Sequence, residues 1–179
     1  MKRRYLLSAM FGLSIAALAA YFAFDFRPGT DRVEAEIDFI LVEKSARRLT
    51  AYQNGVAVQQ FRVALGREPV GPKRCEGDKR TPEGRFTIDS RLDLGQSSFH
   101  RALHISYPRR ADIEAARSAC PNGQAGGQIM IHGLGVELGR LSSTHHQVDW
   151  TLGCIALTNE EIDWLYRNTR NGTAIEIRP

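Results

Sequence analysis

The chain has 179 residues, of which 42% are hydrophobic and 25% are charged, a mixture typical of one globular domain. Its formal net charge is +4. Lys2, Arg3 and Arg4 supply three of these positive charges, and residues 1–24 contain no acid, so residues 25–179 carry a net charge of only +1. A nearly neutral domain gives no electrostatic ground for a nucleic-acid partner, because phosphate binding needs clustered lysine and arginine.

An apolar run from Tyr5 to Phe24 follows this basic cluster and predicts export. Ala17-Leu18-Ala19 offers a small-x-small cleavage site, yet a run of about 20 residues is also long enough to stay as a membrane anchor. Residues 1–24 are therefore interpreted as a signal peptide or a membrane anchor, with the N-terminus in the cytoplasm. We expect the rest of the chain in the periplasm, anchored to the inner membrane by residues 5–24 if the leader is retained.

Residues 25–35 are predicted to form a polar linker, followed by one domain over residues 36–179. Strands are predicted at residues 37–42, 49–52 and 60–65, and Asn54-Gly55 indicates a tight hairpin. Residues 69–84 are rich in Gly, Pro and charge, which predicts a long loop of the kind that is often functional.

The second half of the domain mixes short strands with helices. Strands are predicted at residues 85–88, 102–106, 128–132 and 174–177, and a short helix at residues 111–118. Residues 158–161 read Thr-Asn-Glu-Glu, a capping box that begins a helix ended by Asn171-Gly172. The sequence therefore predicts a mainly β domain with a few helices.

Cys154 follows Gly153 where a polar loop enters an apolar strand, and His132 ends another predicted strand. A free thiol is only a few per cent ionised at pH 7, so a nucleophilic cysteine needs a neighbouring base. His132 would be that base, and a thiol pKa lowered to roughly 6 would leave most of the thiol ionised. The amides of Gly153 and Cys154 would form an oxyanion hole. Considered alone, a cysteine like Cys154 or a histidine like His132 is more often a buried structural side chain than a catalytic one.

Three cysteines in an exported protein leave one odd thiol, and Cys154 is the candidate for it. Cys75 and Cys120 are the remaining pair, each beside loop-forming residues. A disulfide between them is a hypothesis that would tie the loop 69–84 to the segment before the strand of His132.

Three motifs occur in the order found in the YkuD-type L,D-transpeptidase catalytic domain: Thr81-Pro82-Glu83-Gly84-Arg85-Phe86, Ile131-His132-Gly133 and Thr151-Leu152-Gly153-Cys154-Ile155. The chain resembles that family over roughly residues 36–178. The resemblance implies one L,D-transpeptidase-like, β-rich domain without a cofactor, in which Cys154 attacks a diaminopimelate carbonyl of a peptidoglycan stem peptide and His132 is the base. It also implies that Thr151, Gly153 and Gly133 shape the site.

The chain departs from the common pattern of the family. Leu152 stands where many members have His, Ala156 stands where many have Arg or Asn, and the separation of His132 from Cys154 is longer than usual. The form of the cysteine motif is closer to a branch that includes a hydrolase, which implies release of a peptidoglycan-linked lipoprotein. Transfer and hydrolysis use the same thioester, so the sequence leaves both open.

Other interpretations are weighed against this one. His145 and His146 lie near Asp149 without the spacing of a metal site, so we expect no metal and a solvated loop that borders the cleft. Four further residues are treated as structural: His100, His104, Trp150 and Trp164.

Three further alternatives to an L,D-transpeptidase are considered: two other families of cysteine enzymes and one non-catalytic binding domain. A sortase also places His before Cys but needs a longer separation, and papain-like peptidases need a His after the Cys. From another class comes a non-catalytic cell-wall-binding domain of the same fold, which would have no reason to keep Cys154 and His132.

Overall fold

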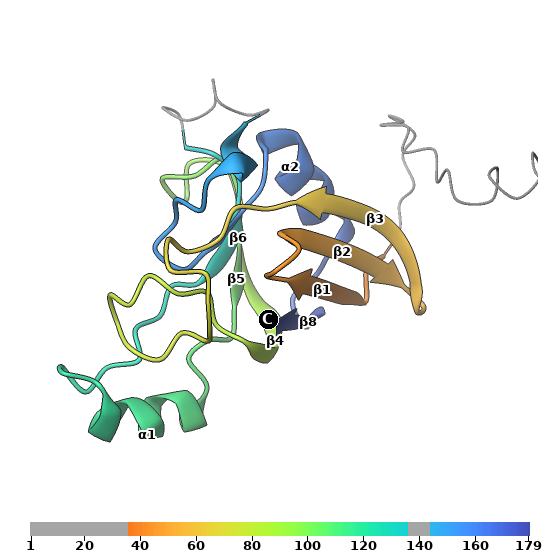
Figure 1. The fold of residues 1–179 in the computed structure, drawn as a ribbon. Coiled ribbons are helices and arrows are strands. Elements are labelled where there is room, and N and C mark those ends of the chain that lie inside the picture. Colours follow the sequence, from red (N-terminus) through yellow and green to blue (C-terminus); the bar gives the residue numbers. More distant parts are fainter. Residues whose placement is uncertain (1–35, 136–143) are drawn as a thin grey trace, which may run out of the picture. The chain divides into compact units, whose positions relative to one another are not determined.

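The computed structural model describes residues 36–135 and 144–179. The predicted leader, residues 1–24, and the predicted linker, residues 25–35, lie outside these ranges. Within them the chain forms eight strands and two α-helices, so the expected mainly β fold is confirmed (Figure 1). Neither of these two helices is long and apolar enough to cross a membrane.

The strands form one sheet in the order β3-β2-β1-β8-β4-β5-β6-β7. Neighbouring strands are antiparallel except in the pairs β1–β8 and β6–β7, which are parallel. The bounds of the strands are β1 Phe39–Glu43, β2 Arg48–Gln53, β3 Val56–Arg62, β4 Gly84–Leu92, β5 Ala102–Ile105, β6 Met130–His132, β7 Ile155–Ala156 and β8 Ala174–Arg178.

The predicted Asn-Gly hairpin joins β2 to β3. Asn54 and Gly55 have φ values of 52° and 77°, the left-handed backbone that a two-residue hairpin turn requires. The prediction of the third strand at residues 60–65 is wrong at both ends. β3 begins directly after this turn, at Val56, and ends at Arg62. Most of its side chains are exposed at a sheet edge, so apolar alternation was a poor guide to its start. Residues 63–65 are buried but lie beyond the strand.

The sheet and α2, Asn159–Asn168, share one apolar core. α2 begins with the predicted capping box: the Glu161 amide donates to Thr158 Oγ1 over 3.2 Å, and the Thr158 amide donates to Glu161 Oε2 over 2.9 Å. Its buried residues Ile162 and Leu165 pack into the core. α1, Arg110–Ala119, buries only Ala116 and lies at the far end of the domain from α2 (Figure 1).

A buried lysine and a disulfide hold the loop 69–84. Lys44 is 2% exposed, and its Nζ donates to Gly71 O, Thr81 O and Glu83 Oε1 over 2.6, 3.1 and 2.7 Å. The hypothesised bridge is present: Cys75 and Cys120 form a disulfide that joins this loop to the segment after α1. All three cysteines lie in the described residues, and Cys154 is the free one.

Candidate active site

β6 and β7 bring the predicted catalytic residues to the same edge of the sheet. His132 ends β6, and Cys154 directly precedes β7, which pairs with β6 so that His132 faces Ala156. The same register pairs Ile155 with Ile131, so Cys154, one residue before Ile155, lies beside the start of β6, the strand that ends at His132. β7 is the last strand in the sheet order, and its outer side is bridged by Ala64, so the Cys154 side chain is half-buried.

The hydrogen bonds of His132 fix which ring nitrogen carries the proton. Nδ1 lies 2.7 Å from Gly133 O, an acceptor, so Nδ1 must be the donor. Nε2 is buried and has no hydrogen-bond partner among the described residues. Burial lowers the pKa of His132 to about 4; the bond to Gly133 opposes this, and the nearby His145 adds to it. At neutral pH the site therefore contains an uncharged imidazole with a bare basic nitrogen.

Two aromatic rings surround this imidazole. Phe99 stacks on it with the ring centroids 3.6 Å apart, and Trp150 meets it edge-on at 5.8 Å. Trp150 was expected only to pack, and nothing in the polar segment around Phe99 indicated that this ring reaches the site. Together the two rings exclude water from the imidazole and hold its plane.

The thiol of Cys154 lies 3.5 Å from the carbonyl oxygen of Gln128, a residue in the left-handed conformation at φ 56°. It makes no hydrogen bond to His132, whose Nε2 has no partner in the described part of the chain. Burial raises the pKa of the thiol, while the amide of Met130 and the charge of Lys73 act in the opposite direction. The direction is the reverse of the lowering expected from the sequence, because burial outweighs these two effects and a neutral His132 adds no positive charge.

Thr151 closes a tight turn just before the cysteine. Its Oγ1 accepts a hydrogen bond from the Gly153 amide over 3.1 Å and donates to Cys154 O over 2.8 Å. The Gly153 amide is thus already engaged, which corrects the expectation that it is available for an oxyanion; of the predicted pair, only the Cys154 amide is left for that role. Leu152 points outward and is 67% exposed.

Two glycines permit close approach of the backbone in the site. Gly153 has φ 134°, and a Cβ there would lie 2.6 Å from Arg80 O. A Cβ on Gly133 would lie 2.7 Å from Cγ2 of Ile162 in α2. Side chains at either position would displace the backbone that holds His132 or Cys154.

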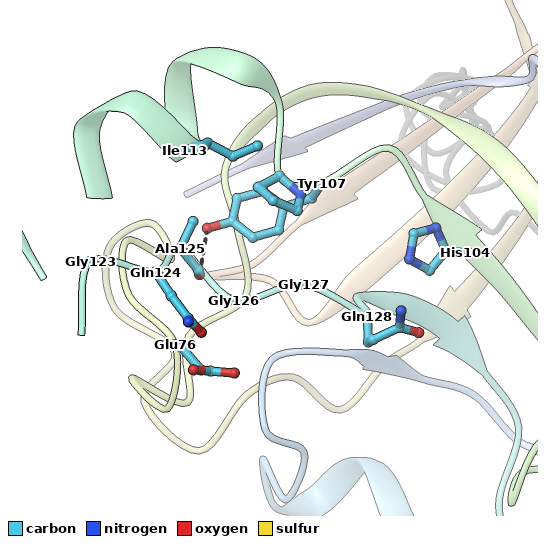
Figure 2. Close-up of a pocket in the computed structure, with 11 residues that line it drawn as sticks. Glu76, His104, Tyr107, Ile113, Gly123, Gln124, Ala125, Gly126, Gly127 and Gln128 are labelled. Carbon is cyan, nitrogen blue, oxygen red and sulfur yellow. Dashed lines mark hydrogen bonds between the residues drawn. The ribbon is translucent and has the colours of Figure 1, made fainter. Parts of the chain in front are cut away.

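A cavity of about 440 Å³ is lined in part by Gln128 (Figure 2). Gln128 connects the cavity to the thiol: it lines the cavity, and its backbone carbonyl oxygen faces Cys154 Sγ. The Tyr107 hydroxyl donates to Ala125 O over 3.2 Å and holds one wall (Figure 2). The cavity is lined by Glu76, His104, Tyr107, Pro108, Ile113 and residues 123–128.

The other histidines differ partly from expectation. His104, treated as structural, contacts Asp89 Oδ1 over 2.6 Å and also lines the cavity. His100 contacts Asp163 of α2 over 3.0 Å. His145 begins a 3₁₀ helix, His145–Gln147, and is buried rather than solvated; burial, with His146 nearby, lowers its pKa to about 4. Within residues 36–135 and 144–179, no three His, Cys, Asp or Glu side chains are arranged to hold a metal ion.

The comparison with protein families defines the class. Residues 37–177 match the YkuD family, described as the L,D-transpeptidase catalytic domain. The chain belongs to this family, as its motifs indicated, and the sheet and the His132–Cys154 edge described above are the part of the fold that carries those motifs.

Individual relatives are distant. The curated protein "Putative L,D-transpeptidase YafK" of Escherichia coli K12 is 24% identical over 133 residues, covering 72% of this chain and 46% of YafK. The helical cell shape determining protein Pgp2 of Campylobacter jejuni is 23% identical with a TM-score of 0.58, covering 79% of this chain and 47% of that one.

A third solved structure is the L,D-transpeptidase, residues 123–326, of Xylanimonas cellulosilytica. It is 18% identical with a TM-score of 0.53, covering 91% of this chain and 68% of that one. These likenesses establish the fold of an L,D-transpeptidase domain. The chain spans about half the length of the curated relative YafK and of Pgp2.

Proposed function

We propose that this protein is a cysteine acyltransferase that acts at a diaminopimelate carbonyl in peptidoglycan stem peptides. One observation carries the proposal: the parallel pairing of β7 with β6 brings the chain's only free thiol beside the strand that ends at His132, whose buried Nε2 has no hydrogen-bond partner among the described residues. Family membership supports the substrate class. Cys154 is the proposed nucleophile and His132 the proposed base.

In the first step, His132 Nε2 takes the thiol proton as Cys154 Sγ bonds to the substrate carbonyl carbon. The carbonyl oxygen becomes an oxyanion, for which the Cys154 amide is the proposed donor. When this intermediate collapses, the bond from carbon to nitrogen breaks and His132 returns its proton to the departing amine. The product is a thioester on Cys154 with both groups again uncharged.

In the second step, an amine attacks the thioester and gives a proton to His132. The bond from carbon to sulfur then breaks, the proton passes to the leaving sulfur, and Cys154 is restored as a thiol. If water enters in place of the amine, the same sequence releases a carboxylic acid. Transfer and hydrolysis therefore differ only in the second nucleophile.

The charges of the site support general-base catalysis rather than a preformed ion pair. Burial lowers the pKa of His132 to about 4 and raises the pKa of the Cys154 thiol. Both groups are then neutral at pH 7, and the proton moves as the new bond forms. The stacked Phe99 and the edge of Trp150 keep water from the basic nitrogen.

The proposed location is the periplasm, since residues 1–24 have the pattern of a signal peptide or membrane anchor. Peptidoglycan stem peptides are the proposed partners, and a wall-linked lipoprotein is the additional partner if water is the acceptor.

The test is to incubate the purified protein with muropeptides and with lipoprotein-linked peptidoglycan and to identify the products by mass spectrometry. Cys154→Ala and His132→Gln are the site variants, and Leu152→Ala, which removes only an exposed side chain, is the matched control. We expect the wild type and Leu152→Ala to form an acyl-enzyme on Cys154, and both site variants to form none.

New cross-links would establish transfer, and release of the lipoprotein without a new amide would establish hydrolysis. If the wild type and Cys154→Ala behaved alike on both substrates, the proposal would be overturned in favour of a non-catalytic wall-binding domain.

A further inference from the structure

A buried ion pair lies in the loop that the disulfide holds, and this loop packs against Gly153, the residue before Cys154. The side chain of Lys73 is 4% exposed, and its Nζ lies 2.8 Å from Asp78 Oδ1. Nζ also donates to Cys75 O over 3.0 Å. The lysine is therefore fixed at its charged end rather than extended into solvent.

Asp78 organises the same loop through backbone amides. Its Oδ2 accepts from the amides of Arg74 and Cys75 over 2.7 and 3.0 Å, and its Oδ1 accepts from the amide of Arg80 over 3.1 Å. Burial alone would raise the pKa of Asp78, but the Lys73 bond and these three amides hold it below its usual value. The carboxylate is therefore ionised at neutral pH.

The loop packs against two segments near the cysteine, the turn at Gly153 and the segment that leads to Gln128. On one side, Arg80 O lies so close to Gly153 that a Cβ there would be 2.6 Å away. On the other, the stem of Lys73 packs on Gly126, where a Cβ would be 3.3 Å from Lys73 Cε. Gly126 is two residues before Gln128, whose carbonyl faces Cys154 Sγ.

We propose that Lys73 is a positioning residue whose positive charge favours the thiolate of Cys154, and that the negative charge of Asp78 partly offsets this effect. The inference rests on the proposed function, in which Cys154 must lose its proton. Lys73 does not touch the substrate; its buried charge acts across the wall formed by residues 126–128. A positive charge near a buried thiol stabilises the ionised form and offsets the cost of burial.

His132 and the ionisable side chains that line the cavity, His104 and Glu76, do not replace this charge. His132, on β6, is uncharged at neutral pH because burial lowers its pKa to about 4. His104, on β5, is bound to Asp89. Glu76, in the same loop as Lys73, accepts from Asn122 over 2.8 Å and carries the opposite charge. Burial raises the pKa of the Cys154 thiol, and the charge of Lys73 acts against that shift.

The test follows the pH dependence of Cys154 alkylation by iodoacetamide in the intact, non-reduced protein, where the other two cysteines are bridged. We expect Lys73→Met to move the midpoint upward and to slow alkylation at pH 7 about tenfold. We expect Asp78→Asn to move the midpoint downward, because it leaves the Lys73 charge unbalanced. Lys79→Met removes an exposed positive charge from the same loop and should leave the midpoint unchanged.

The two opposite shifts separate an electrostatic role from a structural one. If Lys73 and Asp78 only held the loop together, each substitution would break the same ion pair and both midpoints would move in the same direction, which would overturn the inference. Asp78→Asn keeps the shape of the side chain, so its downward shift tests the inference even if Lys73→Met does not fold. Opposite shifts without acyl transfer by the wild type would overturn only the proposed function.

Discussion

Phe99 covers one face of the His132 imidazole, with the two rings 18° from parallel. The stacking ring comes from the loop before β5, whereas the histidine ends β6, so the contact depends on the sheet being formed. Burial is the leading cause of the lowered pKa of His132, and Phe99 supplies part of that burial.

Replacing Phe99 with Ala should therefore raise the pKa of His132 from about 4 toward the ordinary 6.5, because water would reach the ring. NMR titration of the histidine ring protons measures this, with His132→Gln to assign the signal. Phe39→Ala is the matched control, since Phe39 contacts Tyr52 on the distant β1–β2 pair. An unchanged His132 titration in Phe99→Ala would show that this ring does not control the burial of the base.

The stability of the fold should fall as the pH is lowered from 6.5 to 4. The pKa of His132 is about 4 in the folded protein and near 6.5 when exposed, so the unfolded chain binds more protons in this window. Its contribution is present above pH 6.5 and is lost as the pH falls through 4. We expect about 2 kcal/mol less unfolding free energy at pH 5 than at pH 7 from this one group.

Urea unfolding at pH 5 and pH 7 measures this change in the unfolding free energy. In His132→Gln the change between the two pH values should be smaller by about 2 kcal/mol. The comparison with the variant also removes the effect of Glu161, whose pKa burial raises and which acts in the opposite direction. A wild type and a His132→Gln variant with the same pH dependence would contradict the expectation.

Gly153→Ala should abolish acylation and destabilise the domain by about 2 kcal/mol, since an overpacked position with φ 134° must shift its backbone. The nearest atom, Arg80 O, belongs to the backbone and has little freedom to yield. Gly172→Ala is the control: its φ is also positive, at 92°, but nothing lies within 4 Å of a new Cβ. Thermal unfolding and acyl-enzyme mass spectra should separate the two variants, and equal losses would mean that backbone strain alone explains the effect.

Removing the disulfide should lower stability by about 4 kcal/mol, the chain-entropy value for a bridge that spans 45 residues. The variant is Cys75→Ala with Cys120→Ala, measured by denaturant unfolding with and without dithiothreitol. Reductant should weaken the wild type to a similar extent and leave the double variant unchanged. A wild type indifferent to full reduction would show that the loop is held by Lys44 and Asp78 alone.

The features that the sequence predicted well are those with a local cause. The capping box of Thr158 and Glu161 and the turn at Asn54-Gly55 each depend on residues within a few positions, and both occur in the structure. The family motifs placed His132 and Cys154 at strand ends, which is where β6 and β7 have them.

The features that were missed depend on contacts between distant segments. Lys44 follows a strand and has the pattern of an exposed turn residue, yet three acceptors from the loop 69–84 bury its ammonium group. His145 lies in a polar sequence and is buried all the same. The direction of the Cys154 pKa was also missed, because burial is a property of the assembled sheet edge.

β8 lies between β1 and β4, so the last strand of the chain joins the first strand to the half of the sheet that holds the active site. Before residues 174–178 are available, β1 pairs only with β2 and β4 pairs only with β5. The two halves of the sheet, β3-β2-β1 and β4-β5-β6-β7, therefore join only when residues 174–178 are in place. Pairing strands so far apart in sequence is expected to slow this step of folding.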